Sequence, residues 1–264
     1  MNWTDDALIL NARKFGENSV ILHAFTREHG RYAGIVRGGT GRRLRGILQP
    51  GNEVRVTWRS RLTEQLGAFT VEAGKSHAAN LFETPLALLA GSSALALLDI
   101  ALPEREPHSQ LFEASLLLLK TLGEETDIWP HLLIRWELGL LTEIGYGLDL
   151  TACAATGSTE DLVYVSPKSG RAVSAGAGAP YRDKLLKLPA FLKQNPENTE
   201  AERGEGAENA DILDGLALTG CFLEKFISDH RPGVHLSARE RLVAGVRRQY
   251  QAGRDEMMSE DDLP

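Results

Sequence analysis

The chain has 264 residues, a hydrophobic content of 42% and a formal net charge of −7, which suits one large domain or two or three small ones with apolar cores. It has two cysteines, which excludes a disulfide framework and fits a reducing cytoplasm. The N-terminus MNWTDDALIL lacks the order of a signal peptide, and the most apolar run, residues 85–102, is too short and too interrupted to cross a membrane.

The charge is distributed unevenly along the chain. Residues 1–80 carry 12 Lys/Arg and 7 Asp/Glu, a net of +5, whereas the rest carries 17 basic and 29 acidic side chains, a net of −12. A basic front half on an acidic body indicates that the first part binds nucleic acid or another anion.

Five short segments near the start predict β-strands, at residues 6–13, 19–26, 31–37, 53–60 and 65–72. The alternation in the fourth segment places one set of side chains on an apolar face, namely Val54, Val56 and Trp58, and turns Arg55 and Arg59 toward solvent. Five strands separated by glycine-rich turns predict a small closed or partly open barrel.

An arginine-rich segment, residues 31–50, breaks this pattern. Its strand-like start ends at Gly38-Gly39, and the apolar pattern resumes at Ile47-Leu48. The glycines predict a tight, mobile loop. Five arginines surround it: Arg31, Arg37, Arg42, Arg43 and Arg45. Clustered guanidinium groups with few acids nearby favour an anionic, phosphate-bearing partner, and a solubilising surface hairpin is the alternative.

From Leu81 onward, apolar positions recur at helical spacing. Helices are predicted at residues 84–101, 108–122, 128–145, 180–194, 211–229 and 237–251. Residues 146–180 form a Gly/Ala/Ser-rich stretch with one short hairpin, VYVSPKSGRAV. Residues 195–210 are rich in acid and lack aliphatic side chains larger than alanine, so we expect a disordered loop there.

No motif predicts a catalytic or metal site. Gly74-Lys75-Ser76 has the end of a phosphate-binding loop, but Phe69 stands where that loop needs a glycine. Neither His-Glu-x-x-His nor Gly-x-Ser-x-Gly occurs. Cys221 lies in an apolar run and is expected to be a buried small hydrophobe.

Several weak motifs, in a fixed order along nearly the whole chain, resemble the RecO family of bacterial DNA repair and recombination mediators. The opening pattern is Ala7-Leu8-Ile9-Leu10 and Arg13-Lys14-Phe15-Gly16-Glu17, followed by Thr26 and Gly30. The basic segment runs from Val36-Arg37-Gly38 through Arg45 to Leu48-Gln49-Pro50. The middle matches at Trp136-Glu137-Leu138-Gly139-Leu140-Leu141 and Gly145-Tyr146.

With the strand and helix patterns, the resemblance implies an α+β fold with a five-stranded OB-fold barrel at residues 1–80. A mostly α-helical domain would follow in two parts, 81–145 and 180–252, with a zinc-ribbon-like insert at 146–179 and an acidic tail at 253–264. Many relatives carry two Cys-x-x-Cys pairs in the insert. Here the first pair reads Cys153-Ala154-Ala155-Thr156 and the second region, 171–178, has no cysteine. The insert is therefore degenerate, and we expect neither zinc nor another cofactor.

For function, the resemblance implies a non-enzymatic mediator of recombinational DNA repair in the bacterial cytoplasm, associated with the nucleoid. It implies binding of single- and double-stranded DNA, annealing of complementary strands, and partnership with RecR. It also implies contact with the C-terminal tail of the single-strand-binding protein and so, indirectly, the loading of RecA.

The residues expected to contact phosphates are Arg37, Arg42, Arg43 and Arg45 on the loop with Arg31, Arg55 and Arg59 on the strands. Tyr32 is the expected stacking residue, while Trp58 and Phe69 are expected in the core. The alternative function is an RNA-binding OB-fold adaptor, because basic strands do not distinguish DNA from RNA.

Overall fold

The computed structural model describes residues 1–61, 66–81, 84–124, 127–193 and 205–260. These divide into two compact units, Met1–Trp129 and Pro130–Pro264. None of the helices in the described ranges combines the length and apolar character that crossing a membrane requires.

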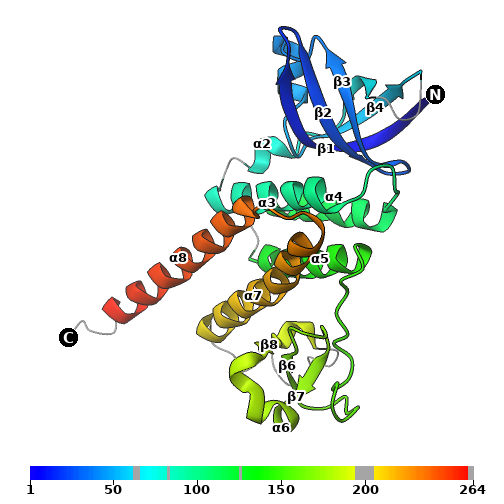
Figure 1. The fold of residues 1–264 in the computed structure, drawn as a ribbon. Helices are drawn as coiled ribbons and strands as arrows, with labels where there is room; N and C mark the ends of the chain where they lie inside the picture. Colours follow the sequence, from blue (N-terminus) through cyan, green and yellow to red (C-terminus); the bar gives the residue numbers. More distant parts are fainter. Residues whose placement is uncertain (62–65, 82–83, 125–126, 194–204, 261–264) are drawn as a thin grey trace. The chain divides into compact units, whose positions relative to one another are not determined.

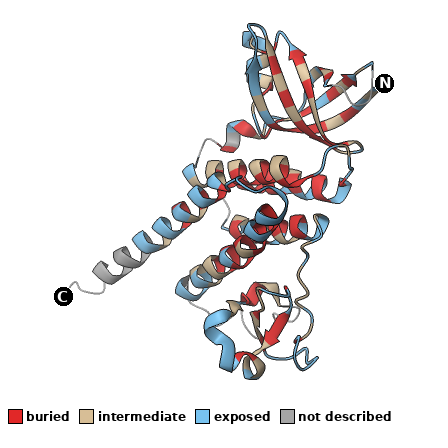
Figure 2. Ribbon diagram, in the orientation of Figure 1, coloured by how far each residue is buried: buried red, intermediate tan, exposed pale blue. Residues whose placement is uncertain are grey.

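The first unit begins with a closed five-stranded barrel (Figure 1), as the sequence predicted. Its strands, in the order β1-β2-β3-β5-β4 around the barrel, confirm the five predicted segments. They are β1 (Asn2–Phe15), β2 (Ser19–Thr26), β3 (Gly30–Arg37), β4 (Glu53–Arg59) and β5 (Gly67–Ala73). Buried and exposed residues alternate along β4 as predicted, with Trp58 inside and Arg55 outside (Figure 2).

The barrel closes because β1 pairs with two neighbours. Its first half pairs with β4, from Asn2 opposite Arg59 to Leu8 opposite Glu53. Along its other edge it pairs with β2, from Ala7 opposite Thr26 to Phe15 opposite Ser19, with a register shift between Ile9 and Asn11. The remaining gap is closed by a short parallel contact in which Gly34 lies opposite Gly67.

Both glycines of the parallel contact make room for core aromatics. A Cβ atom on Gly34 would lie 2.6 Å from the Phe69 ring, and one on Gly67 would lie 2.2 Å from the Trp58 ring. Trp58 and Phe69 are buried, as predicted, among apolar side chains from all five strands. The absence of side chains at two positions therefore fixes where β3 and β5 approach.

The glycine-rich segment after β3 differs from its prediction. Arg42–Ile47 form a short helix, α1, where a tight, mobile loop was predicted. Leu44 and Ile47 pack against the barrel core, and Leu48 is buried beside them. The apolar side of this helical turn thus covers the end of the barrel core. An extended chain at Ile47-Leu48 would leave that end uncovered.

Three helices complete the first unit: α2 (Ala78–Leu81), α3 (Pro85–Ala101) and α4 (Ser109–Leu122). The Thr84 side chain caps α3 by accepting a hydrogen bond from the Ala87 N–H, and Pro85 stands in the first turn, where its missing N–H costs nothing. The apolar run 85–102 is a largely buried helix, as predicted, and it packs against β1 and β2.

The second unit is built on three long helices, α5 (Trp129–Glu143), α7 (Glu205–His230) and α8 (Ser237–Glu260). Between α5 and α7 lie a small sheet of β6 (Leu162–Val165), β7 (Ala172–Ser174) and β8 (Leu186–Lys187), and the one-turn helix α6 (Ala175–Gly178). This mixed arrangement confirms the α+β class.

The predicted element boundaries in the second unit need two changes. The helix expected at 180–194 is wrong, because this segment contains two 3-10 turns, Ala179–Lys184 and Ala190–Leu192, on either side of β8. Helix α8 extends beyond residue 251, where the prediction ended, and includes the first part of the predicted acidic tail. Of the predicted disordered loop, 195–204 lie outside the described residues and 205–210 belong to α7.

A buried ion pair joins the three long helices. Arg239 of α8 donates from Nε to Glu137 Oε1 at 2.7 Å and from Nη2 to Glu137 Oε2 at 2.9 Å. Glu137, on α5, is fully buried, and Thr219 of α7 donates to the same carboxylate at 2.5 Å. Burial alone would lower the pKa of Arg239, but the charge and hydrogen bonds of Glu137 raise it.

Replacing Glu137 with alanine should destabilise the helical unit by about 3–5 kcal/mol, because it leaves the Arg239 charge buried without its counter-ion. Urea unfolding followed by far-ultraviolet circular dichroism measures the change. Arg241→Ala on the exposed side of α8 is the control, with an expected effect within about 0.5 kcal/mol. An equal, small effect of both variants would contradict a stabilising role for the pair.

Candidate nucleic-acid interface

Four of the predicted arginines gather at one end of the barrel. Arg37 ends β3, and Arg42, Arg43 and Arg45 project from α1. All four are exposed, because the apolar side of α1 is used against the barrel. No carboxylate forms an ion pair with them among the residues that the structure describes.

The barrel adds residues that the sequence reasoning left out of the site. Two rows of residues run across β1, β2 and β3. In the first row Arg13 pairs with Ile21 and Ile21 with Ile35; in the second, Phe15 pairs with Ser19 and Ser19 with Arg37. Directly opposed residues share a sheet face, so Arg13, Phe15 and Arg37 share the outer face of the barrel. Phe15 is 49% exposed, and Lys14, which lies opposite Val20 on the inner face, is exposed at the end of β1. The sequence shows Phe15 beside two cations, but only the register of β1 reveals that its ring stays in solvent.

The two sets of residues meet at this end of the barrel. The Thr40 hydroxyl, in the turn before α1, contacts the Glu17 carbonyl, in the turn between β1 and β2, at 3.4 Å. We call this surface the basic end of the barrel. It comprises Arg13, Lys14, Arg37, Arg42, Arg43, Arg45 and Phe15.

Arg31 is not part of this surface, contrary to expectation. Its side chain is 8% exposed, and its Nε donates to the Leu102 carbonyl at 2.9 Å. Its terminal nitrogens lie 3.5 Å from carboxylate oxygens of Asp99 and Glu104. Helix α3 and the segment after it cover the start of β3, so Arg31 fastens the barrel to the helices and cannot reach a phosphate.

Tyr32, the expected stacking residue, packs against other aromatic rings of the barrel. Its half-buried ring packs edge-on against Trp3 at 4.9 Å and Trp58 at 5.2 Å between ring centroids. The Arg105 guanidinium lies over it, 5.5 Å from the ring centroid. With these contacts Tyr32 belongs to the aromatic core.

Arg55 and Arg59 lie elsewhere on the barrel. Both are exposed on β4, whose neighbours are β5 and the first half of β1. Arg55 also forms an ion pair with Asp6 at 3.0 Å, which neutralises part of its charge. The eight predicted residues therefore separate into four arginines at the basic end, the buried Arg31 and half-buried Tyr32, and the β4 pair.

In the insert, hydroxyl groups lie around the Cys153 thiol. The Cys153 sulfur accepts hydrogen bonds from the Ser174 N–H at 3.3 Å and the Ser174 hydroxyl at 3.4 Å. The Ser174 side chain, followed by the Thr156 side chain and the Ser174 backbone, lowers the pKa of the Cys153 thiol to about 6. Hydroxyl groups thus surround the one thiol, and within the described ranges no three His, Cys, Asp or Glu side chains gather into a site for a metal ion. The expected likeness to a zinc ribbon stays a prediction.

Comparison with known proteins gives one consistent result. The family models "Recombination protein O N terminal" and "Recombination protein O C terminal" match residues 1–76 and 83–232. A protein of Rhodospirillum centenum named "DNA repair protein RecO" is 48% identical over 252 residues, 95% of this chain and 96% of its own length. Proteins of the same name from Rhodopseudomonas palustris and Beijerinckia indica are 46% and 48% identical, each over 95% of this chain and at least 97% of their own length.

Elemental analysis of the purified protein should find far less than one zinc per chain, because a single thiol cannot complete a structural zinc site. As a positive control, Thr156→Cys with Ser174→Cys places two further thiols around the Cys153 sulfur, and this double variant should retain zinc. One zinc per wild-type chain would show that other ligands have replaced the missing cysteines.

Proposed function

The chain belongs to the RecO family of DNA repair proteins, and on that premise we propose that it is a non-enzymatic mediator of recombinational repair. In this proposal it binds single- and double-stranded DNA and anneals complementary strands. The observation that supports it best is the basic end of the barrel, which carries six exposed cations and one exposed aromatic ring.

The basic end suits a sugar-phosphate backbone better than a base edge. Its cations lie on a strand end and on a short helix, so their guanidinium groups form a broad surface and not a deep pocket. Such contacts neutralise phosphates and release counter-ions without reading sequence. Phe15 adds a face on which any base can stack, which favours single strands over duplex.

Annealing follows from the same charges. Two complementary strands repel each other through their phosphates, and cations held at one surface reduce that repulsion while the bases remain free to pair. This step needs no nucleotide hydrolysis, which agrees with the sequence around Lys75, where the phosphate-binding loop is incomplete. Arg55 and Arg59 on β4 are candidates for contacts with the second strand.

The remaining parts of the proposal concern partners and place. RecR, the C-terminal tail of the single-strand-binding protein and, through them, RecA would be the partners of a cytoplasmic, nucleoid-associated protein. The family membership supports these partners. A matched RNA oligomer that competes as well as DNA would instead favour the RNA-binding adaptor.

Replacing Arg42, Arg43 and Arg45 together by alanine should flatten the plot of log affinity for single-stranded DNA against log salt by about two units, near 0.7 for each phosphate that is no longer neutralised. Fluorescence anisotropy over a salt series measures this slope. The matched control replaces three exposed cations of the helical unit, Lys225, Arg241 and Arg248, and should leave the slope nearly unchanged. Equal slopes for wild type and the α1 variant would rule out α1 as a phosphate-binding element.

Phe15→Ala should weaken binding of single-stranded DNA by about 1–3 kcal/mol, because one stacked base no longer has its platform, and should leave the salt slope as it was. Phe15→Trp should restore the affinity. The same titrations with duplex DNA should show a much smaller effect. A change in slope without a change in affinity at low salt would assign Phe15 to a different role.

A further inference from the structure

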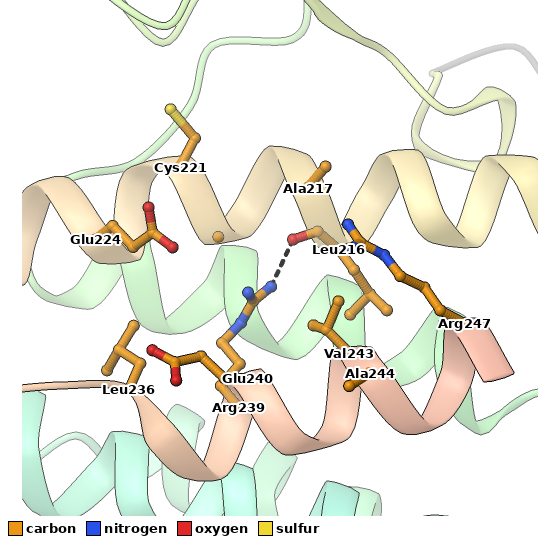
Figure 3. A pocket seen from close by; sticks show the side chains of 11 residues that line it. Leu216, Ala217, Cys221, Glu224, Leu236, Arg239, Glu240, Val243, Ala244 and Arg247 are labelled. Atoms are coloured by element: carbon orange, nitrogen blue, oxygen red, sulfur yellow. Dashed lines mark hydrogen bonds between the residues drawn. The ribbon is translucent and has the colours of Figure 1, made fainter.

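A groove lies between α7 and α8, and none of the residues assigned above to DNA binding lines it. It has a volume of about 390 Å³, and its apolar lining includes Leu216, Leu236 and Val243. Figure 3 shows the side chains that line it, with those of α7 above and those of α8 below. Both helices belong to the second unit, so the groove is complete within it.

Arg239 places an unused hydrogen-bond donor in this groove. Its Nε and Nη2 bind Glu137, Thr219 and the Leu216 carbonyl, whereas Nη1 has no hydrogen-bond partner among the described residues. The side chain is only 7% exposed. Nη1 is not one of the fully buried polar atoms that lack a partner, so it reaches the groove surface, where it is available to a ligand that supplies an oxygen.

Gly220 keeps that donor accessible. A Cβ atom at this position would lie 2.6 Å from Arg239 Nη1, so any other residue would fill the space beside the guanidinium. Gly220 lies inside a long helix, where glycine is costly compared with alanine. The packing of α7 on Arg239 therefore requires glycine here, and it leaves one donor at the groove surface.

The charges around the groove select the kind of acceptor. Arg239 is already neutralised by Glu137, and Figure 3 shows Glu224 and Glu240 at one end of the groove and Arg247 toward the other. Burial, followed by the charge of Glu224, raises the pKa of the Cys221 thiol, which also lines the groove. One end is thus acidic, so an anionic segment would be repelled there and a cationic one attracted.

We propose that this groove binds a short segment of a partner protein that carries apolar side chains and a lysine or arginine. A backbone carbonyl of the segment accepts from Arg239 Nη1, its apolar side chains lie on Leu216, Leu236 and Val243, and its cation lies between Glu224 and Glu240. Glu240 and Arg247 are two helical turns apart, about 10 Å, which spans three or four residues of extended chain. This site is independent of the DNA-binding proposal.

Two fluorescent octapeptides test the assignment on the full-length protein by anisotropy. One has the sequence MMSEDDLP, which is that of residues 257–264, and the other, MMSKKKLP, differs only in three charges. The basic peptide should bind at least about tenfold more tightly. Glu224→Gln with Glu240→Gln should reduce its affinity about tenfold, as expected for two exposed ion pairs.

Two tryptophan variants separate binding in the groove from attraction to the acidic body. Ala244 is exposed and lines the groove, so Ala244→Trp should abolish binding of the basic peptide, whereas Gln249→Trp, at an exposed position outside the lining, should not. Tighter binding of the acidic peptide, or binding that Ala244→Trp leaves unchanged, would overturn the proposal. Absence of binding by both peptides up to millimolar concentration would also overturn it.

Discussion

The pairing of β1 with both β2 and β4 is the constraint on which the rest of the first unit depends. A strand has two edges, and β1 uses one for β4 over Asn2–Leu8 and the other for β2 over Ala7–Phe15, where the register shifts between Ile9 and Asn11. That shift decides which side chains of the second half face outward. Arg13 and Phe15 come to lie on the face that also carries Arg37, so the candidate DNA surface is a consequence of how β1 pairs with β2.

Arginine has two opposite roles in this chain, and the difference is a matter of desolvation. Arg31 and Arg239 are buried, and each finds carboxylate and carbonyl acceptors, because an unpaired buried charge would be too costly. The arginines of α1 remain in solvent, where they keep their charge without compensation. Only the second kind can exchange water for phosphate at low cost, which is why the candidate site is at the barrel end.

Much of this fold could be predicted from the sequence, because strands with one buried face alternate in a period of two and long helices repeat their apolar positions. All five barrel strands were found in this way. Helix α1 was missed because its six residues are too few for a periodic signal, and its glycines and arginines resemble a loop. Arg31 and Tyr32 make their contacts with α3 and with the segment after it, up to Arg105. Contacts between residues so far apart in the chain produce no pattern in the local sequence. Phe15 was overlooked for the converse reason, since only the register reveals that its ring stays in solvent.

A chain with a net charge of −7 can still bind a polyanion. Salt screens distant charges, so binding depends mainly on the charges close to the bound polyanion. At physiological salt, exposed charges more than about 8 Å apart interact weakly, so the cations that lie within that distance of a phosphate matter more than the net charge of the chain. The six cations of the basic end also set an upper limit on the phosphates that this end can neutralise, and each contributes a salt-dependent increment. An interface of this size, with one stacking ring and no enclosing cleft, favours contacts that form and break readily. That property suits a protein that brings strands together and then yields them to another, whereas a deep, charge-dense channel would retain the DNA.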